Sequence, residues 1–235
     1  IIPSDIASTA HASDFVYNTT HDKLGCWATN FSRKFYEDHG FFLKKGGLEI
    51  CRKDDDARWE ELKRKVESGK AFGTNIRLIS AAEAKEKFPL LNEESIRGAM
   101  WDPDAGLVTP RSQDVVNFAV ETAKEKGALS TFTDTPAIDF DVENGRITGV
   151  KTDKGTIKTN KVVITSGIWG PLMGKKAGVP VPLMPVEHPL LFFGPLPEIQ
   201  GTEELLVYPL LRDQGNSAYV RDTGRLHGGM LEWGY

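Results

Sequence analysis

The spacing of hydrophobic residues predicts four helices in the first half of the chain. Between residues 21 and 39, apolar side chains recur every three or four positions, the repeat of one helix face, and Gly40 marks the end. Ser80 followed by Glu83 has the spacing of a capping box, which begins a short helix before Pro89. The helices are expected over residues 21–39, 54–67, 80–88 and 112–126.

Alternating apolar and polar residues, interrupted by glycine turns, predict strands elsewhere. Gly46-Gly47 is interpreted as the turn of a hairpin between residues 41–43 and 48–50. Asn144-Gly145, a strong two-residue turn signal, is expected to join two strands that flank it. The other expected elements are strands over 139–142 and 147–150, a turn at 153–155, a buried strand at 161–165, and strands over 190–193, 204–207, 217–221 and 225–231.

Composition and charge exclude several classes of protein. The chain has 235 residues, 40% of them hydrophobic and 26% charged, as in ordinary globular proteins. Its 29 basic and 33 acidic residues give no basic patch for nucleic acid. No apolar run approaches the roughly 20 residues that span a bilayer. We therefore expect a soluble globular protein with neither nucleic-acid nor membrane partners.

The chemistry-bearing residues form no complete short motif. Cys26 and Cys51 are too few for a disulfide framework, so two buried thiols are expected. The five histidines, at positions 11, 21, 39, 188 and 227, lack metal-ligand spacing, so no metal site is expected. The glycine-rich fingerprints of nucleotide sites are absent, as are the motifs of zinc proteases and serine hydrolases.

Several weak motifs nevertheless occur in one order along essentially the whole chain. They are Ser8-Thr9-Ala10-His11-Ala12, Phe15-Val16-Tyr17-Asn18-Thr19, Gly46-Gly47-Leu48-Glu49-Ile50, Arg77-Leu78-Ile79-Ser80, Phe88-Pro89-Leu90-Leu91, Asp104-Ala105-Gly106-Leu107-Val108, Ser166-Gly167-Ile168-Trp169-Gly170 and Pro185-Val186-Glu187-His188. Their order and spacing resemble the dimethylglycine and sarcosine dehydrogenases and dimethylglycine oxidase, within the glycine oxidase and D-amino-acid oxidase group of FAD proteins. The resemblance implies oxidation of an N-methylated amino acid, with tetrahydrofolate as a further partner in some members.

The resemblance is to the middle of such an enzyme. Family members begin with a strand, a glycine-rich turn and a helix that hold the FAD pyrophosphate, and these are not recognisable here. The expected fold is α/β (mixed α+β), with a truncated FAD-binding domain interleaved with a truncated substrate domain on a mixed, mainly antiparallel sheet. The FAD part is expected over residues 1–40 and 106–180, and the substrate part over 41–105 and 181–235. The isolated chain is expected to bind FAD weakly or not at all.

The resemblance also assigns cofactor contacts. The imidazole of His11 would bond to the flavin 8α carbon and tether FAD, although from the residues alone His11 could be a capping or surface histidine. The other expected contacts are Ser8 and Thr9 beside it, Pro136 and Ala137 in the strand at the adenine, Ser166, Gly167 and Trp169 in a turn against FAD, and Gly228 and Gly229 beside the flavin ring. Trp169 could equally be a plain core residue.

His188 and Tyr219 are the candidate catalytic residues. They match the family histidine and tyrosine that face the substrate, although ordinary strand packing is the alternative for both. An amine gives up hydride only when its lone pair is free, and alkylamines are mostly protonated near neutral pH. An imidazole can accept that proton and a phenol can orient the nitrogen. Arg212 and Arg221 are further candidates, to bind the substrate carboxylate.

Two other functions stay open at this stage. One is a non-catalytic regulatory module that resembles these flavoproteins, and the other is a glycine oxidase-like enzyme whose FAD is not covalently bound. The joint presence of His11, His188 and Tyr219 favours an enzyme. The expected compartment is the bacterial cytoplasm or, in a eukaryote, the mitochondrial matrix.

Overall fold

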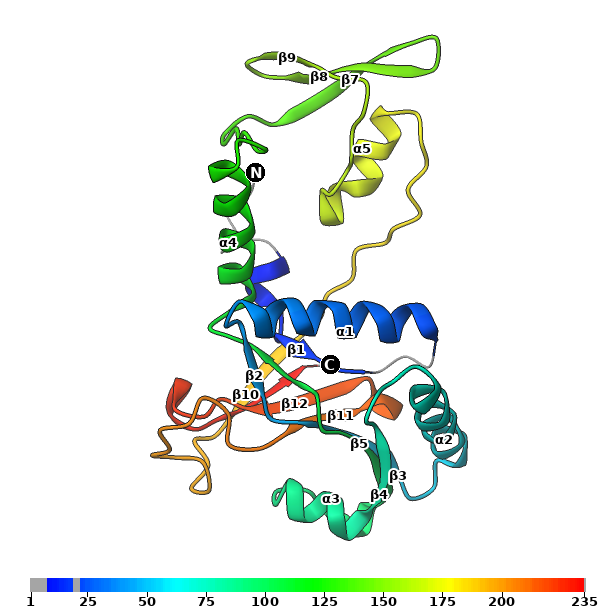
Figure 1. Ribbon diagram of the computed structural model, residues 1–235, viewed down its shortest axis with the longest axis vertical. Coiled ribbons are helices and arrows are strands. Elements are labelled where there is room, and N and C mark those ends of the chain that lie inside the picture. The colour runs from blue at the N-terminus through cyan, green and yellow to red at the C-terminus, as the bar shows by residue number, and fades with distance from the viewer. Residues whose placement is uncertain (1–7, 19–21, 235) are drawn as a thin grey trace. The chain divides into compact units, whose positions relative to one another are not determined.

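The chain folds into two units that alternate along the sequence (Figure 1). The computed structural model describes residues 8–18 and 22–234. Of these, residues 8–11 and 116–187 form unit 1, and residues 12–18, 22–115 and 188–234 form unit 2. The assignment of FAD and substrate parts to segments of the chain stays a prediction.

A seven-stranded sheet is the framework of unit 2. Its strands run in the order β10-β13-β12-β11-β3-β5-β4, and the β11–β3 pair is parallel while the other neighbours are antiparallel. The bounds are β3 (Gly47–Arg52), β4 (Arg77–Ser80), β5 (Ile96–Asp102), β10 (Leu190–Phe193), β11 (Leu210–Asp213), β12 (Ala218–Asp222) and β13 (Leu231–Gly234). The expected mixed α/β class with a mainly antiparallel sheet is confirmed.

Two hydrophobic cores form on opposite faces of this sheet, because successive side chains of a strand point to opposite faces. Helix α2 (Asp56–Ala71) contributes Leu62 and Val66 to the core that contains Met100. Helix α3 (Ala81–Lys87) contributes Ala84 to the core that contains Leu48. The predicted capping box begins α3, and a short helix, η2 (Glu93–Ser95), follows it. Figure 1 shows α2 and α3 against the sheet.

A three-stranded sheet packs over the α2 side of unit 2. It contains β1 (Phe15–Val16), β6 (Gly106–Val108) and β2 (Phe42–Lys44), in that order, with α1 (Lys23–Asp38) contacting β2. Asp22 caps α1 by accepting a hydrogen bond from the Gly25 amide at 2.7 Å. The apolar stripe that predicts this helix is exposed within the described structure: Leu24, Trp27 and Phe31 are 60–72% accessible.

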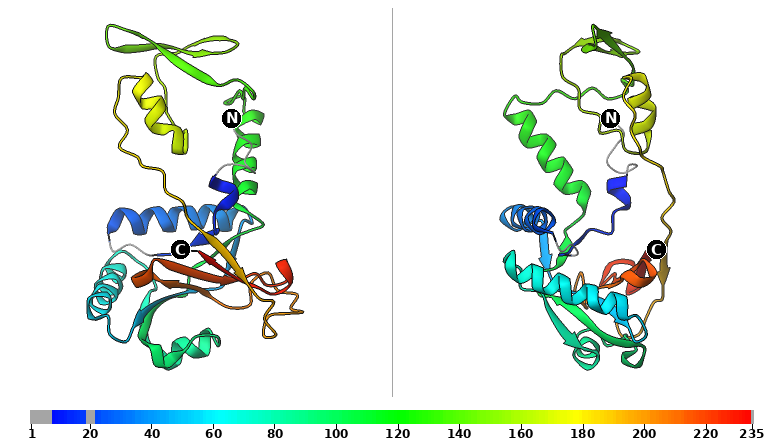
Figure 2. Two further views of the ribbon diagram at one scale, coloured as in Figure 1. Left: turned by 180° about the vertical axis from the view of Figure 1, so that it is seen from behind. Right: turned by 90° about the vertical axis from the view of Figure 1, so that its right-hand side faces the viewer.

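Unit 1 is built from a hairpin ribbon and short helices (Figure 2). Its elements are η1 (Ser8–His11), most of α4 (Ser112–Glu125), β7 (Ala137–Glu143), β8 (Arg146–Thr152), β9 (Gly155–Lys158), η3 (Gly167–Trp169) and α5 (Gly170–Lys176). The Asn144-Gly145 hairpin is confirmed, with both turn residues at positive φ. Phe140 is the one buried hydrophobic side chain among the residues described in this unit.

The hairpin predicted at Gly46-Gly47 is wrong. β2 pairs with β6 of the small sheet, whereas β3 pairs with β5 and β11 of the large one. The two glycines are needed instead for close approach of aromatic rings. A Cβ on Gly46 would lie 2.1 Å from a ring atom of Trp101, and one on Gly47 would lie 2.2 Å from a ring atom of Tyr17.

The buried strand predicted at residues 161–165 is also wrong. The segment pairs with no strand in the described structure, and the side chain of Val163 is 84% exposed. Its apolar residues have the composition of a strand, but a strand forms only where a neighbouring backbone completes its hydrogen bonds. No described backbone does so here.

Two later strand predictions differ because side chains and glycines redirect the backbone. Residues 204–207 form no strand, since the Val207 amide donates to the Asp222 carboxylate at 2.9 Å instead of to a neighbouring strand. Residues 225–231 divide into η5 (Leu226–Gly228) and the start of β13, because residues 227–229 have positive φ.

Strands β4, β5 and β11 and the short helix η4 (Gln214–Asn216) were not anticipated from the sequence. No helix in the described ranges is long and apolar enough to cross a bilayer.

Candidate active site

The two candidate catalytic side chains meet in unit 2. The rings of His188 and Tyr219 have centroids 5.6 Å apart and planes inclined at 54°. Tyr219 lies in β12, and His188 lies two residues before β10, where its side chain is exposed. The sequence separates these residues by several turns and strands, and the order of strands in the sheet brings them together.

Three further residues surround the Tyr219 ring. Phe15 meets it edge-on, with ring centroids 5.3 Å apart. Ser13 lies close enough for its hydroxyl to lower the pKa of the Tyr219 phenol. Gly234 lies directly opposite Tyr219 in the β12–β13 register, and the ring rests against it. Neither Ser13 nor Gly234 was expected as a site residue, because neither belongs to a recognisable motif.

The environment of Tyr219 keeps its hydroxyl protonated at neutral pH. Burial, and to a smaller extent the negative charge of Glu232, raises the pKa of Tyr219 above its ordinary value of 10.0. The Ser13 hydroxyl and the positive charge of Arg221 act in the opposite direction. A neutral phenol can both donate and accept a hydrogen bond, so the group can orient an amine.

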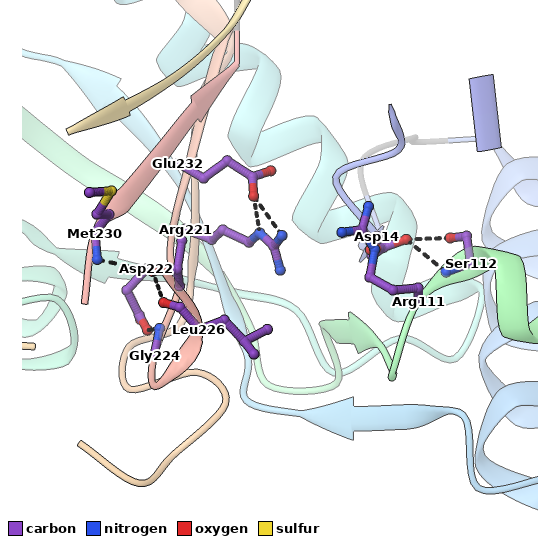
Figure 3. Close-up of polar contacts among 10 residues, drawn as sticks. Asp14, Arg111, Ser112, Arg221, Asp222, Gly224, Leu226, Met230 and Glu232 are labelled. Carbon is purple, nitrogen blue, oxygen red and sulfur yellow. Dashed lines mark hydrogen bonds and ion pairs between the residues drawn. The ribbon is translucent and has the colours of Figure 1, made fainter. Parts of the chain in front are cut away.

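The two candidate arginines differ in their partners. Arg221 is buried and donates from both Nε and a terminal nitrogen to one oxygen of Glu232, at 2.9 and 2.5 Å (Figure 3). Arg212 donates to the neutral Gln214 side chain at 2.6 Å and forms no ion pair with a described residue. The guanidinium of Arg221 is therefore already neutralised by Glu232, and Arg212 is the better candidate for a substrate carboxylate.

Asp14 anchors the segment that carries Ser13 and Phe15. Its buried carboxylate accepts hydrogen bonds from the Ser112 amide, at 3.1 Å, and from the Ser112 hydroxyl, and it pairs with Arg111 at 3.0 Å (Figure 3). The Asp14 carbonyl also accepts a hydrogen bond from the Val108 amide at 2.8 Å. These contacts fix the residues that follow His11 to the beginning of α4.

A second polar cluster lies inside unit 2, under Tyr17. Glu49, which is fully buried, accepts a hydrogen bond from Lys65 at 2.7 Å. Asp102, also fully buried, accepts hydrogen bonds from the backbone amides of Asn18, at 3.0 Å, and Asp104, at 2.9 Å. Burial raises the pKa of Tyr17, and the charges of Glu49 and Asp102 raise it further. This cluster lies in the core, and no three His, Cys, Asp or Glu side chains of the described residues form a metal-binding group.

In unit 1, the expected FAD contacts lie at three places. His11 and Ser8 are exposed in η1, with Thr9 half-buried between them, and Pro136 and Ala137 are exposed where β7 begins. The third place is the turn before α5, which has a buried polar atom and an open backbone position. The Ser166 hydroxyl oxygen is buried without a hydrogen-bond partner in the described structure, and the space beside Gly167 is open. Trp169 is half exposed, so it is not a core residue of this unit.

Gly228 and Gly229 occupy different environments in unit 2. Space beside Gly228 is open, at a φ of +69°. A Cβ on Gly229 would lie 2.8 Å from backbone atoms of Gln200, and the Gly229 carbonyl accepts a hydrogen bond from the Leu196 amide. The second glycine is therefore explained by packing against this chain's own backbone, and only Gly228 has free space beside it. Cys26 and Cys51 are both buried and form no disulfide, as expected.

Comparison with known proteins identifies one family. The family described as DAO, FAD dependent oxidoreductase, matches residues 6–234. Human mitochondrial sarcosine dehydrogenase is 31% identical over 206 residues, which cover 82% of this chain and 21% of that protein. Mitochondrial dimethylglycine dehydrogenase of Rattus norvegicus is 27% identical over 180 residues, covering 77% and 20%.

A solved structure agrees with this relationship. The crystal structure of L-proline dehydrogenase from P. horikoshii superposes with a TM-score of 0.77 at 31% sequence identity, covering 95% of this chain and 59% of that one. The chain thus spans about a fifth of the length of these two curated relatives. The family match extends over nearly all of the described residues. The chain therefore belongs to the DAO family of FAD-dependent oxidoreductases.

Proposed function

We propose that the protein oxidises an N-methylated amino acid, such as dimethylglycine or sarcosine, by passing a hydride from the carbon beside the amine nitrogen to FAD. The contact between His188 and Tyr219 is the observation that carries this proposal, since it brings a proton acceptor and a phenol together in unit 2. Family membership and the likeness to sarcosine and dimethylglycine dehydrogenases support the choice of an amine.

The two side chains have distinct roles in the proposed reaction. Alkylamines have pKa values near 10.4, so the substrate nitrogen is protonated at neutral pH and must lose its proton before oxidation. His188 accepts that proton, because an imidazole nitrogen can act as a general base. Tyr219 orients the protonated nitrogen, because its neutral hydroxyl can accept a hydrogen bond from the N–H before the proton leaves. Arg212 binds the substrate carboxylate through its planar guanidinium.

The residues of unit 1 fit part of a dinucleotide. The buried Ser166 hydroxyl lacks a partner in the described structure, and the open backbone at Gly167 lets a large group approach closely. Ser8, Thr9, Pro136, Ala137 and Trp169 are proposed as further contacts. Bound FAD supplies the hydride acceptor.

The exposed side chain of His11 in η1 supports a role in binding the cofactor, because an exposed imidazole is accessible for bond formation. We propose His11 as the covalent attachment site of FAD, with tetrahydrofolate as a further partner and the bacterial cytoplasm or mitochondrial matrix as the compartment.

Acid precipitation of the intact flavin-loaded protein, rather than of the isolated chain, tests this assignment. Flavin fluorescence is expected to stay with the precipitated chain of the wild type and to move to the supernatant in His11→Ala. His39→Ala, which alters another exposed histidine, is the matched control and is expected to retain the flavin. Covalent flavin in His11→Ala would contradict the assignment.

The isolated chain is expected to bind added FAD weakly, because its sequence has no glycine-rich turn to donate several amide hydrogens to the pyrophosphate. Titration followed by the flavin absorption spectrum measures this. Tight one-to-one binding would show that the residues described above are sufficient to hold the cofactor.

A further inference from the structure

We propose that Gly234 and Ser13 are positioning residues, which together fix the orientation of the Tyr219 phenol. The effect that we expect on catalysis rests on the proposed function, whereas the contacts of Tyr219 are a property of this chain alone. It extends the site to two residues on separate elements. Gly234 is in β13, and Ser13 is in the segment before β1.

Gly234 acts by lacking a side chain. A Cβ at this position would lie 1.9 Å from Cζ of Tyr219 and 2.2 Å from its hydroxyl oxygen. These separations are far shorter than any real contact, so even a methyl group would displace the ring. Glycine weakens a strand interior, and the φ of Gly234 is not among the positive values that would require glycine. Close approach of the Tyr219 ring is therefore the reason for glycine at this position.

Ser13 fixes the other end of the side chain. Gly234 and Phe15 determine where the ring lies, and the Ser13 hydroxyl acts on the phenol oxygen, whose pKa it lowers. Asp14 holds this segment in place through Ser112 and Arg111, so the Ser13 hydroxyl has a rigid support. A phenol constrained from both sides presents one orientation to a substrate, and loss of either constraint releases it.

The proposed role of Ser13 is separate from the proposed flavin attachment at His11. A change at Ser13 is expected to alter the phenol while leaving covalent flavin in place.

Nuclear magnetic resonance of the chain labelled with 13C at tyrosine Cζ tests the structural part directly. The chain has five tyrosines, and Tyr219→Phe identifies the signal of Tyr219. Ser13→Ala and Gly234→Ala are each expected to shift that signal, and Ser13→Thr, which keeps the hydroxyl, is expected to restore it. In Ser13→Ala, Tyr219 should also titrate at higher pH than in the wild type, because the Ser13 hydroxyl lowers its pKa.

Ser95→Ala is the matched control. It removes a serine hydroxyl that donates to the Asn92 carbonyl at 2.7 Å in η2, which contacts α3. The Tyr219 signal is expected to stay unchanged in this variant. An unchanged Tyr219 signal in both Ser13→Ala and Gly234→Ala would overturn the inference. If Gly234→Ala does not fold, the comparison of Ser13→Ala with Ser13→Thr decides the question.

Kinetics of the flavin-loaded protein separate this inference from the proposed function. Ser13→Ala is expected to lower kcat about fivefold, the worth of one hydrogen bond, with KM nearly unchanged. Gly234→Ala is expected to lower it about a hundredfold, because small misplacements of a reacting group are costly. Signals that shift while kcat stays at the wild-type value would support the positioning of Tyr219 and contradict its proposed catalytic role.

Discussion

The two units differ in how they bury hydrophobic side chains. Unit 2 has a core on each face of its seven-stranded sheet, with Leu48, Leu62 and Met100 fully buried. Unit 1 buries Phe140, while Val163 and Leu172 among its described apolar side chains remain exposed. Burial of apolar surface is the main source of folding free energy. We conclude that unit 2 provides most of the stability, and that the catalytic pair lies on this more stable part.

Capping of helices follows the same division. In unit 2, the Ser80 hydroxyl accepts a hydrogen bond from the Glu83 amide, and the Glu83 side chain accepts one from the Ser80 amide. In unit 1, neither Ser166 before η3 nor Trp169 before α5 makes a side-chain cap bond. Short helices of unit 1 therefore depend on tertiary contacts for their stability.

The largest expected difference is in the free energy of unfolding that is lost when an ion pair is broken in each of the two units. Glu232→Gln in unit 2 leaves the buried Arg221 without its charge partner, and is expected to lower the free energy of unfolding by about 3–5 kcal/mol. Glu121→Gln in unit 1 removes an exposed ion pair with Lys124 and is expected to change the free energy of unfolding by at most about 0.5 kcal/mol. Urea denaturation measures both. Equal losses would contradict the contrast between the units.

Truncation of an apolar side chain sharpens the comparison. Leu48→Ala empties space in a core of unit 2 and is expected to lower the free energy of unfolding by about 3 kcal/mol. Ile157→Ala in β9 of unit 1 alters a side chain that is 45% exposed, so a loss below about 1 kcal/mol is expected. The same denaturation experiment decides the result. A larger loss for Ile157→Ala would mean that unit 1 has a core comparable to that of unit 2.

The smallest expected effect concerns pH and the capping box of α3. The hydrogen bond from the Ser80 amide, followed by that from the Ser80 hydroxyl, lowers the pKa of Glu83 below its ordinary value of 4.5. Its folded pKa is thus below the unfolded value, so Glu83 stabilises the protein above pH 4.5 and loses this contribution as the pH falls. Thermal unfolding of the wild type and Glu83→Gln should differ at pH 7 and converge in acid. A difference independent of pH would contradict the lowered pKa.

Elements set by neighbouring residues were predictable from the sequence. The Asn144-Gly145 turn and the capping box at Ser80 depend on residues within three positions of one another, and the structure confirms both. Gly46-Gly47 misled the prediction because glycine has two uses. The pattern indicates a turn, whereas the structure uses the pair to admit the rings of Trp101 and Tyr17 from distant segments.

The strands and contacts that were missed all depend on distant partners. β11 was not anticipated because its first pairing, Leu210 with Gly47, joins residues far apart in the chain. The His188 and Tyr219 assignments came from a family resemblance, and their contact came from the structure. Ser13 carries no signal in its own neighbourhood, because its partner, Tyr219, is near the opposite end of the chain.

Three aromatic rings of unit 2 lie against glycine backbone, and this has a consequence for sequence divergence. Each ring occupies the volume that a side chain at the facing glycine would fill: Trp101 at Gly46, Tyr17 at Gly47 and Tyr219 at Gly234. The two members of a couple therefore share one fixed volume. Among distant homologues, a larger residue at one member should accompany a smaller residue at the other, so these couples should diverge together.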